Sequence, residues 1–367
     1  MTDFTLQTRQ GSAAQFPALA RFSDKADNSF GVVRLLAAIA VIVTHAYGIV
    51  GGYNAAEPLH ATTGLSLGAH AVHVFFVLSG FMVAASWERS SNWRDFVLAR
   101  VLRVMPALIC VNIAIVLIGG LFLTAAAPAQ YWTFDNLGDF LAKTVFLFSV
   151  GTSLEGVFAD NPMPGFINVP IWTIRFEVLC YASLLVVMAA MGILRLKGMA
   201  RLGPVLAVIT LTAVLIGRVQ DYSELSFVEQ LARFMFAFYL GVAAWIARSW
   251  IPVHGGILLV LGALAAVFVQ AGSGVGLPLT ILATAYGSFW LGSLRMGWLQ
   301  RRTASTDLSY GAYIMGFFIQ QWLIATFPQI GVYTNILLAT AIVLPLAWLS
   351  WTFVEKPALG LRKRLLA

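Results

Sequence analysis

The stretch SFGVVRLLAAIAVIVTHAYGIV, residues 29–50, carries one arginine and no acidic residue. A helix of this length reaches about 30 Å, which is the thickness of the hydrocarbon core of a bilayer. Nine further apolar stretches of comparable length follow along the chain. The pattern predicts an all-α, polytopic bundle of about ten transmembrane helices. The predicted spans cover residues 29–50, 69–86, 104–125, 170–192, 203–220, 228–248, 255–271, 277–294, 306–327 and 332–354.

The composition supports this fold class. Of the 367 residues, 59% are hydrophobic and 11% are charged, whereas a soluble domain carries about 25% charged residues. The chain therefore has too little polar surface to cover a soluble globule of its size. The net charge of +7 does not indicate a nucleic-acid partner, because the basic residues lie between apolar runs and form no stripe.

The basic residues predict how the chain is oriented in the membrane. Eighteen of the 23 Lys and Arg residues lie in the two tails and in alternate loops. The positive-inside rule then places both termini in the cytoplasm. We expect a cytoplasmic tail over residues 1–28, a transmembrane domain over 29–356 and a basic cytoplasmic tail over 357–367. Residues 136–150, within a long loop over 126–169, are predicted to form a re-entrant or interfacial helix.

Arg34 and His45 both lie in the first predicted span. Eleven residues at 100° per residue place them on one helix face, with an axial separation of about 16 Å. Arg34 alone is compatible with a snorkelling anchor, and His45 alone with an interhelical hydrogen bond. The shared face favours a substrate path that binds an anion at the cytoplasmic end and handles a proton towards the outside.

Arg100 and Arg103 lie at the cytoplasmic mouth of the third span, three residues apart in RVLRVMP. Arginines in a short loop are an ordinary topology signal. Two arginines on one helix face also make a suitable clamp for phosphate. The residues alone leave both interpretations open.

The fourth span opens near the outer face with WTIRFEVLCY, residues 172–181. Glu177 is a carboxylate in an apolar run, and Tyr181 follows one turn later on the same face. A buried carboxylate is costly unless it is paired. His45 from another helix and Arg175 from a neighbouring turn are candidate partners, although Arg175 lies nearly opposite Glu177 on an ideal helix.

Two further segments carry polar side chains inside predicted spans. His70 and His73 lead into FFVLSGF, residues 75–81, where interfacial histidines are the ordinary explanation. Ser79 and Gly80 are expected to allow close helix packing rather than to act as a nucleophile on a tight turn. In LSYGAYIMGFFIQQ, residues 308–321, Ser309, Tyr313 and Gln320 share a stripe that either joins helices or lines a polar path.

Taken together, these segments resemble the membrane-bound acyltransferase-3 family. The resemblance runs in family order over residues 34–357. It rests on an Arg-x10-His pattern, an R-x-x-R pattern, W-x4-E-x3-Y, S-Y-x-x-Y and a late W-x3-E-K-P. The residues that match are Arg34, His45, Arg100, Arg103, Trp172, Glu177, Tyr181, Ser309, Tyr310, Tyr313, Trp351, Glu355, Lys356 and Pro357. Many members have a histidine where this chain has Gly316, so no role for that histidine is carried over.

The resemblance implies an O-acetyltransferase of the bacterial inner membrane. The donor would be acetyl-CoA, used as a substrate with no bound cofactor, and the acceptor would be an envelope glycan or a lipid-linked oligosaccharide. Arg34, Arg100 and Arg103 would bind the donor, and His45 and Glu177 would be catalytic. Trp172, Tyr181, Ser309, Tyr310, Tyr313 and His73 would line the acceptor pocket. FIQQ, residues 318–321, resembles a subgroup that acts on exopolysaccharide or lipo-oligosaccharide.

Two other classes of protein are compatible with the buried charges. A proton-coupled secondary transporter would use His45 and Glu177 as a relay and the arginines to bind an anionic solute. A structural scaffold would leave the cost of burying Arg34, His45 and Glu177 unexplained. Transfer of label from acetyl-CoA to glycan distinguishes the enzyme from the transporter.

Overall fold

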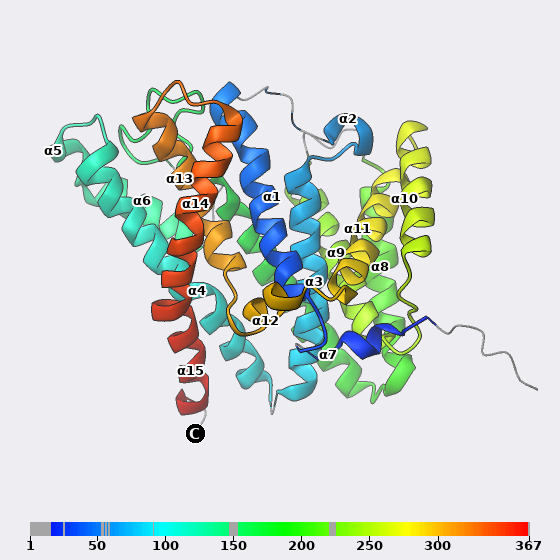
Figure 1. Cartoon of the computed structure of the whole chain (residues 1–367). Helices are drawn as coiled ribbons and strands as arrows, with labels where there is room; N and C mark the ends of the chain where they lie inside the picture. The colour runs from blue at the N-terminus through cyan, green and yellow to red at the C-terminus, as the bar shows by residue number, and fades with distance from the viewer. Residues whose placement is uncertain are drawn as a thin grey trace, which may run out of the picture.

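The computed structural model describes residues 16–24, 26–52, 55, 57, 59–90, 92–146, 153–219 and 225–365, and this part of the chain is a bundle of helices (Figure 1). No β-strand occurs among these residues, apart from two isolated bridges. The predicted all-α fold class is confirmed. Most of the predicted N-terminal tail and the last residues of the predicted segment 136–150 lie outside the described residues.

The longer helices are α1 (Phe30–Gly51), α3 (Leu67–Arg89), α4 (Trp93–Ile118), α7 (Ile174–Ile193), α8 (Leu202–Ile216), α9 (Phe227–Ile246), α10 (Gly255–Gln270), α11 (Gly276–Ser293), α13 (Ser309–Thr326) and α14 (Val332–Ser350). The shorter helical elements are η1 (Leu19–Phe22), α2 (His60–Thr63), η2 (Gly119–Leu123), α5 (Pro128–Tyr131), α6 (Phe134–Val145), η3 (Val169–Thr173), η4 (Gly198–Arg201), α12 (Gly297–Ser305), η5 (Trp351–Glu355) and α15 (Lys356–Leu365).

Each of the ten predicted spans coincides with one of the longer helices. In the described part of the chain, seven helical segments are long and apolar enough to cross a membrane. An eighth is present if α11 and α12, which meet at 105°, form one span. A multi-pass membrane protein is therefore the right class, and the count of ten spans stays a prediction.

The two ends of the described chain lie on the same, lower side of the bundle in Figure 1. There η1 pairs with the segment after α9, where the backbone N–H of Leu19 donates to the carbonyl of Ile251. On the same side α15 continues α14 through the π-helical turn η5. This arrangement agrees with an even number of spans, and the assignment of that side to the cytoplasm rests on the Lys and Arg count.

The segment predicted as a re-entrant or interfacial helix forms α6, which has 12 residues. Twelve residues rise about 18 Å, which is too short to cross the hydrocarbon core. The helix begins where the Thr133 hydroxyl accepts a hydrogen bond from the Asn136 N–H, and it packs against α4. Lys143 and Asp139 form an exposed ion pair on its polar face. A short helix outside the bundle core is consistent with the prediction.

The closest helix crossing in the described chain joins α3 and α9 at the centre of the bundle. A Cβ atom added to Gly80 would lie 1.9 Å from the carbonyl oxygen of Phe238, and one added to Gly241 would lie 2.0 Å from that of Val77. Small residues at such a crossing let two backbones approach within a membrane. The prediction that Gly80 serves close packing is confirmed, and this crossing positions Ser79 for the site described below.

We expect Gly80→Ala to lower the thermal stability of the protein in detergent, because overpacking costs about 1–3 kcal/mol where neither backbone can yield. The matched control is Gly262→Ala in α10, where an added Cβ meets nothing within 4 Å. An unfolding temperature of Gly80→Ala equal to that of the control would contradict the close crossing.

Candidate active site

A cavity of about 810 Å³ lies among α1, α3, α4, α7, α13 and α15. Its volume is within the range of roughly 300–1,000 Å³ that small-molecule sites occupy. Seven of the eleven predicted site residues line this cavity: Arg34, Arg100, Arg103, Glu177, Tyr181, Tyr310 and Tyr313. The structure therefore brings Glu177 into the same space as the arginines, although the sequence pattern placed them towards opposite faces.

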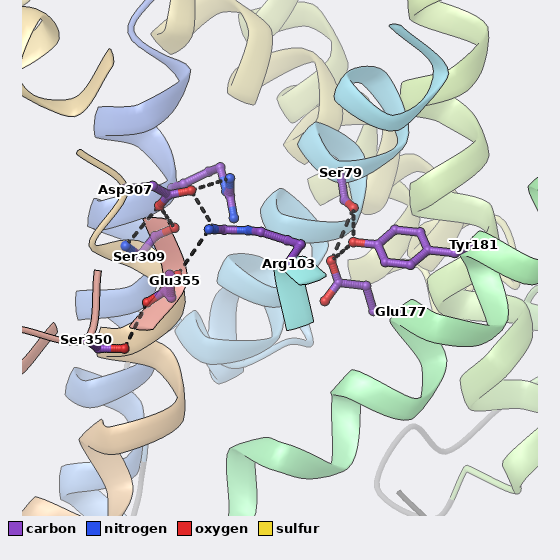
Figure 2. Close-up of polar contacts among 9 residues, drawn as sticks. Ser79, Arg103, Glu177, Tyr181, Asp307, Ser309, Ser350 and Glu355 are labelled. Atoms are coloured by element: carbon purple, nitrogen blue, oxygen red, sulfur yellow. Dashed lines mark hydrogen bonds and ion pairs between the residues drawn. The ribbon is translucent and has the colours of Figure 1, made fainter. Parts of the chain in front are cut away.

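Asp307 anchors one wall of the cavity (Figure 2). It lies in the short joint between α12 and α13, where its Oδ2 accepts hydrogen bonds from Arg34 at 2.9 Å and from Arg103 at 2.6 Å. Its Oδ1 accepts hydrogen bonds from the hydroxyl and the backbone N–H of Ser309, at 2.6 and 3.1 Å. One carboxylate thus joins α1, α4 and the start of α13.

Glu355 gives Arg103 a second carboxylate partner. It is the last residue of η5 and is 1% exposed, and its Oε2 lies 3.1 Å from Nη1 of Arg103. The hydroxyl of Ser350 donates to its Oε1 at 3.0 Å. The guanidinium of Arg103 also lies 5.5 Å from the ring centre of Tyr310 and 5.9 Å from that of Trp351. Arg103 is therefore held on several sides, and its positive charge is compensated within the protein.

Arg100 has different surroundings from Arg103. It donates to the Ser86 hydroxyl at 3.2 Å and lies over the rings of Phe96 and Tyr181. Its Nε is buried without a partner, and within the described residues no carboxylate lies within ion-pair distance of it. Both members of the predicted pair reach the cavity, but only Arg103 forms ion pairs there.

Five arginines line the cavity, against the three acidic residues Asp24, Glu177 and Asp307. Arg362 pairs with Asp95 at 2.6 Å, as Arg34 and Arg103 pair with Asp307. Arg89, which is exposed at the end of α3, forms no ion pair within the described chain. Arg89 and Arg100 are therefore the two lining arginines without an ion-pair partner in the described chain, and such guanidiniums can bind an anionic ligand.

Glu177 forms a small hydrogen-bonded group on the opposite side of Arg103 from Asp307 (Figure 2). Its Oε1 accepts hydrogen bonds from the Tyr181 hydroxyl, one turn later on α7, and from the Ser79 hydroxyl at 3.2 Å. The expected side-by-side arrangement of Glu177 and Tyr181 is confirmed. The expected partnership of Glu177 with His45 is wrong, since no hydrogen bond or ion pair joins these two described residues. Glu177 stays beside the arginines, whereas His45 lies about 16 Å further along α1 than Arg34.

His45 lies outside the cavity lining. Its ring meets the edge of Phe317 on α13, with 5.1 Å between the ring centres. Tyr313, one turn before Phe317, does line the cavity, and its hydroxyl lies 2.6 Å from that of Thr173 and donates to the Pro170 carbonyl at 3.1 Å. Tyr313 and Thr173 thus form a hydrogen-bonded layer in the cavity wall, one turn of α13 away from the Phe317 that His45 contacts.

Most of the other predicted pocket residues have structural contacts that account for their positions, and His73 is the exception. Tyr310 donates to the carbonyl of Val104 at 2.8 Å, and Ser309 bonds to Asp307 outside the cavity lining. Trp172 packs against Phe176 and Phe234 and does not reach the cavity. His73 is fully buried and also lies outside the lining. The polar stripe of α13 joins helices at Gln320. The side-chain amide of Gln320 donates hydrogen bonds to the carbonyl of Ile42 in α1 and to Oδ1 of Asn335 in α14.

The sequence analysis did not predict three residues of the site as site residues, namely Asp307, Ser79 and Glu355. Asp307 precedes the S-Y-x-x-Y segment by two residues. A carboxylate just before a helix that carries polar side chains could have indicated a site residue. Glu355 lies within W-x3-E-K-P, but the pattern does not reveal its partner. Ser79 was assigned to packing alone, and its hydroxyl also serves Glu177.

Comparison with known proteins identifies the family and the relatives that this chain matches. The family described as an acyltransferase domain matches residues 27–355. An "O-acetyl transferase" of Shigella phage Sf6 is 30% identical over 336 residues, which covers 90% of this chain and 95% of the relative. "Nodulation protein 10" of Rhizobium leguminosarum bv. viciae is 28% identical over 366 residues, with 93% and 95% covered. No solved structure matches the chain.

We expect Arg103→Met to lower the unfolding free energy by about 3–5 kcal/mol, because it leaves Glu355 and part of Asp307 buried without a counter-charge. The additional substitution Glu355→Gln should recover part of the loss. Thermal unfolding in detergent measures both effects, with the exposed Arg94→Met as the control. A single variant as stable as the wild type would show that the Asp307 network does not hold the helices together.

Proposed function

This chain belongs to the acyltransferase domain family, and we propose that it transfers an acetyl group from cytoplasmic acetyl-CoA to a hydroxyl of an envelope glycan. Membership makes it a membrane O-acyltransferase. The acetyl group is supported by the name of the Shigella phage relative. Exopolysaccharide, O-antigen and lipo-oligosaccharide are the proposed acceptors, and the bacterial inner membrane is the proposed location.

The donor half of the proposal rests on Arg100, which lines a cavity of about 810 Å³ and has no ion-pair partner in the described chain. Guanidinium groups bind phosphate oxygens with two parallel hydrogen bonds, and acetyl-CoA carries several phosphates. Arg100 and the exposed Arg89 would bind them, since neither pairs with a carboxylate in the described chain. Arg34 and Arg103, which are tied to Asp307, would shape the site rather than bind the donor's charge.

The proposed reaction exchanges one bond to the acetyl carbon for another. The acceptor hydroxyl oxygen attacks the thioester carbonyl carbon, the carbon–sulfur bond breaks, and the products are an O-acetyl ester and the free thiol of CoA. His45 acts as the general base that takes the hydroxyl proton, which finally resides on the thiol. In a second version of the step, the imidazole carries the acetyl group before the hydroxyl attacks.

In this proposal the acetyl group reaches His45 by passing between Tyr313 and Thr173. Their hydroxyls lie 2.6 Å apart, so these two side chains have to separate first. Glu177 lies on the donor side of this layer with Tyr181 and Ser79. We assign Glu177 the task of holding those two hydroxyls around the acyl end of the donor, in place of orienting His45.

Arg100→Gln should raise the Michaelis constant for acetyl-CoA roughly ten- to hundredfold, the worth of one charge-assisted hydrogen bond to phosphate. The Michaelis constant for the acceptor should not change. Initial rates with labelled acetyl-CoA and purified membranes provide the measurement, with the exposed Arg94→Gln as the control. A selective effect on the acceptor would exclude the phosphate-binding role.

His45→Ala should reduce acetyl transfer by roughly a hundred- to ten-thousandfold, the usual contribution of a general base. The variant should still fold, because no hydrogen bond to the His45 side chain is present in the described chain and its ring only packs on Phe317. Label in the glycan reports transfer, and size-exclusion chromatography reports folding. Full acetylation by a well-folded His45→Ala protein would rule out this mechanism.

A further inference from the structure

Arg233 is an arginine inside the bundle that no step of the proposed reaction uses. It lies in α9 within FVEQLARFMFAF and is 7% exposed. Its Nε is buried without a partner, and no hydrogen bond or ion pair to this side chain is formed by the residues that the structure describes. Its guanidinium lies 4.6 Å from the ring centre of Phe234, which is its principal contact. An arginine cannot lose its proton in a protein, so this charge stays in place.

His73 lies next to Arg233 and is also without a partner. It is 0% exposed, and both of its ring nitrogens are buried with no hydrogen bond in the described structure. Both side chains lie beside Phe234, whose ring centre is 6.3 Å from that of His73 and 4.6 Å from the Arg233 guanidinium. The neighbouring His70 does not complete the pair, since its two nitrogens bond to Thr284 and Thr63.

The two side chains lie at the same depth on neighbouring helices. Each is six residues after the start of its helix, or about 9 Å along the axis. The two helices run in the same direction, because Phe76 stacks on Phe234 and, further along both helices, Phe81 meets Trp245. Arg233 and His73 therefore form one buried polar position between α3 and α9.

Neither side chain lines the cavity, but an aromatic pair connects their position to it. Phe76 lines the cavity and stacks on Phe234 at 4.5 Å, and Arg233 lies over that same Phe234 ring. A single aromatic layer thus separates Arg233 from the inner end of the cavity. Phe234 and Phe76 are buried at 0% and 4% exposure, so the site faces the interior of the bundle and not the surrounding lipid.

An unpaired buried charge costs several kcal/mol, and an apolar side chain in its place would be more stable. A charged residue inside a membrane bundle marks a ligand site when it has no partner in the protein. We propose that Arg233 and His73 bind an anionic group, carboxylate or phosphate, of the acceptor glycan. Arg233 would form paired hydrogen bonds to the oxyanion and His73 would donate one more. The assignment to the acceptor rests on the proposed function, whereas the binding of an anion does not.

The test measures anion binding without any transfer reaction. Full-length protein in neutral detergent is unfolded by heat with added glucuronate, glucose or inorganic phosphate at matched ionic strength. The wild type should gain about 2–4 °C with glucuronate or phosphate well above their dissociation constants, and none with glucose. Because Arg100 is assigned to phosphate as well, the variants are compared in an Arg100→Gln background. There Arg233→Gln should lose this gain, Arg233→Lys should keep part of it, and the exposed Arg295→Gln should keep all of it.

Kinetics with an acidic acceptor complete the test. Arg233→Gln should raise the Michaelis constant for the acceptor about tenfold or more and leave that for acetyl-CoA unchanged. If the wild type transfers no acetyl group but still responds to glucuronate, the anion site holds and the acetyltransferase function fails. An Arg233→Gln protein with the wild-type anion response would overturn the site. Stabilisation seen only in phosphatidylglycerol vesicles, and not with either soluble anion, would replace the acceptor by a lipid headgroup.

Discussion

The carboxylate of Asp307 lies between the guanidiniums of Arg34 and Arg103, and much of the lower half of the bundle is organised around it (Figure 2). Charges inside a membrane protein need partners from the protein itself, because lipid supplies none. Because Asp307 binds two arginines at once, it connects α1 to α4 and fixes where α13 begins. Glu355 extends the same network to the C-terminal helices. The cavity is the space that these connected helices leave open.

This network also divides the arginines into two kinds. Arg103 is surrounded by carboxylates and aromatic rings, whereas Arg100 faces the cavity without an ion-pair partner in the described chain. The two residues are three apart on one helix and would be treated alike in any sequence pattern. Their difference comes entirely from the helices opposite them. Another arginine without an ion-pair partner among the described residues, Arg233, lies behind the aromatic layer of Phe76 and Phe234.

The helices were predictable because each stretch has to satisfy the bilayer alone, and every predicted span coincides with a helix. Relations within one helix were also predictable, as for Glu177 and Tyr181 at a spacing of four residues. Partners between helices were not, since the periodicity of a helix does not say which neighbour its polar face meets. The expected contact of Glu177 with His45 was wrong for that reason. Arg233 was overlooked because a single charge in an apolar run resembles an ordinary anchor.

The layer of Tyr313 and Thr173 has a consequence for the cell as well as for the reaction. Tyr313 and Thr173 line the cavity, whereas His45 lies outside its lining, against Phe317. A protein with a continuous aqueous passage would let protons run down the electrochemical gradient that powers the membrane. A hydroxyl pair that separates only when an acyl group passes would confine such a leak to the moments of transfer. The energetic cost of the reaction to the cell would then be proportional to turnover.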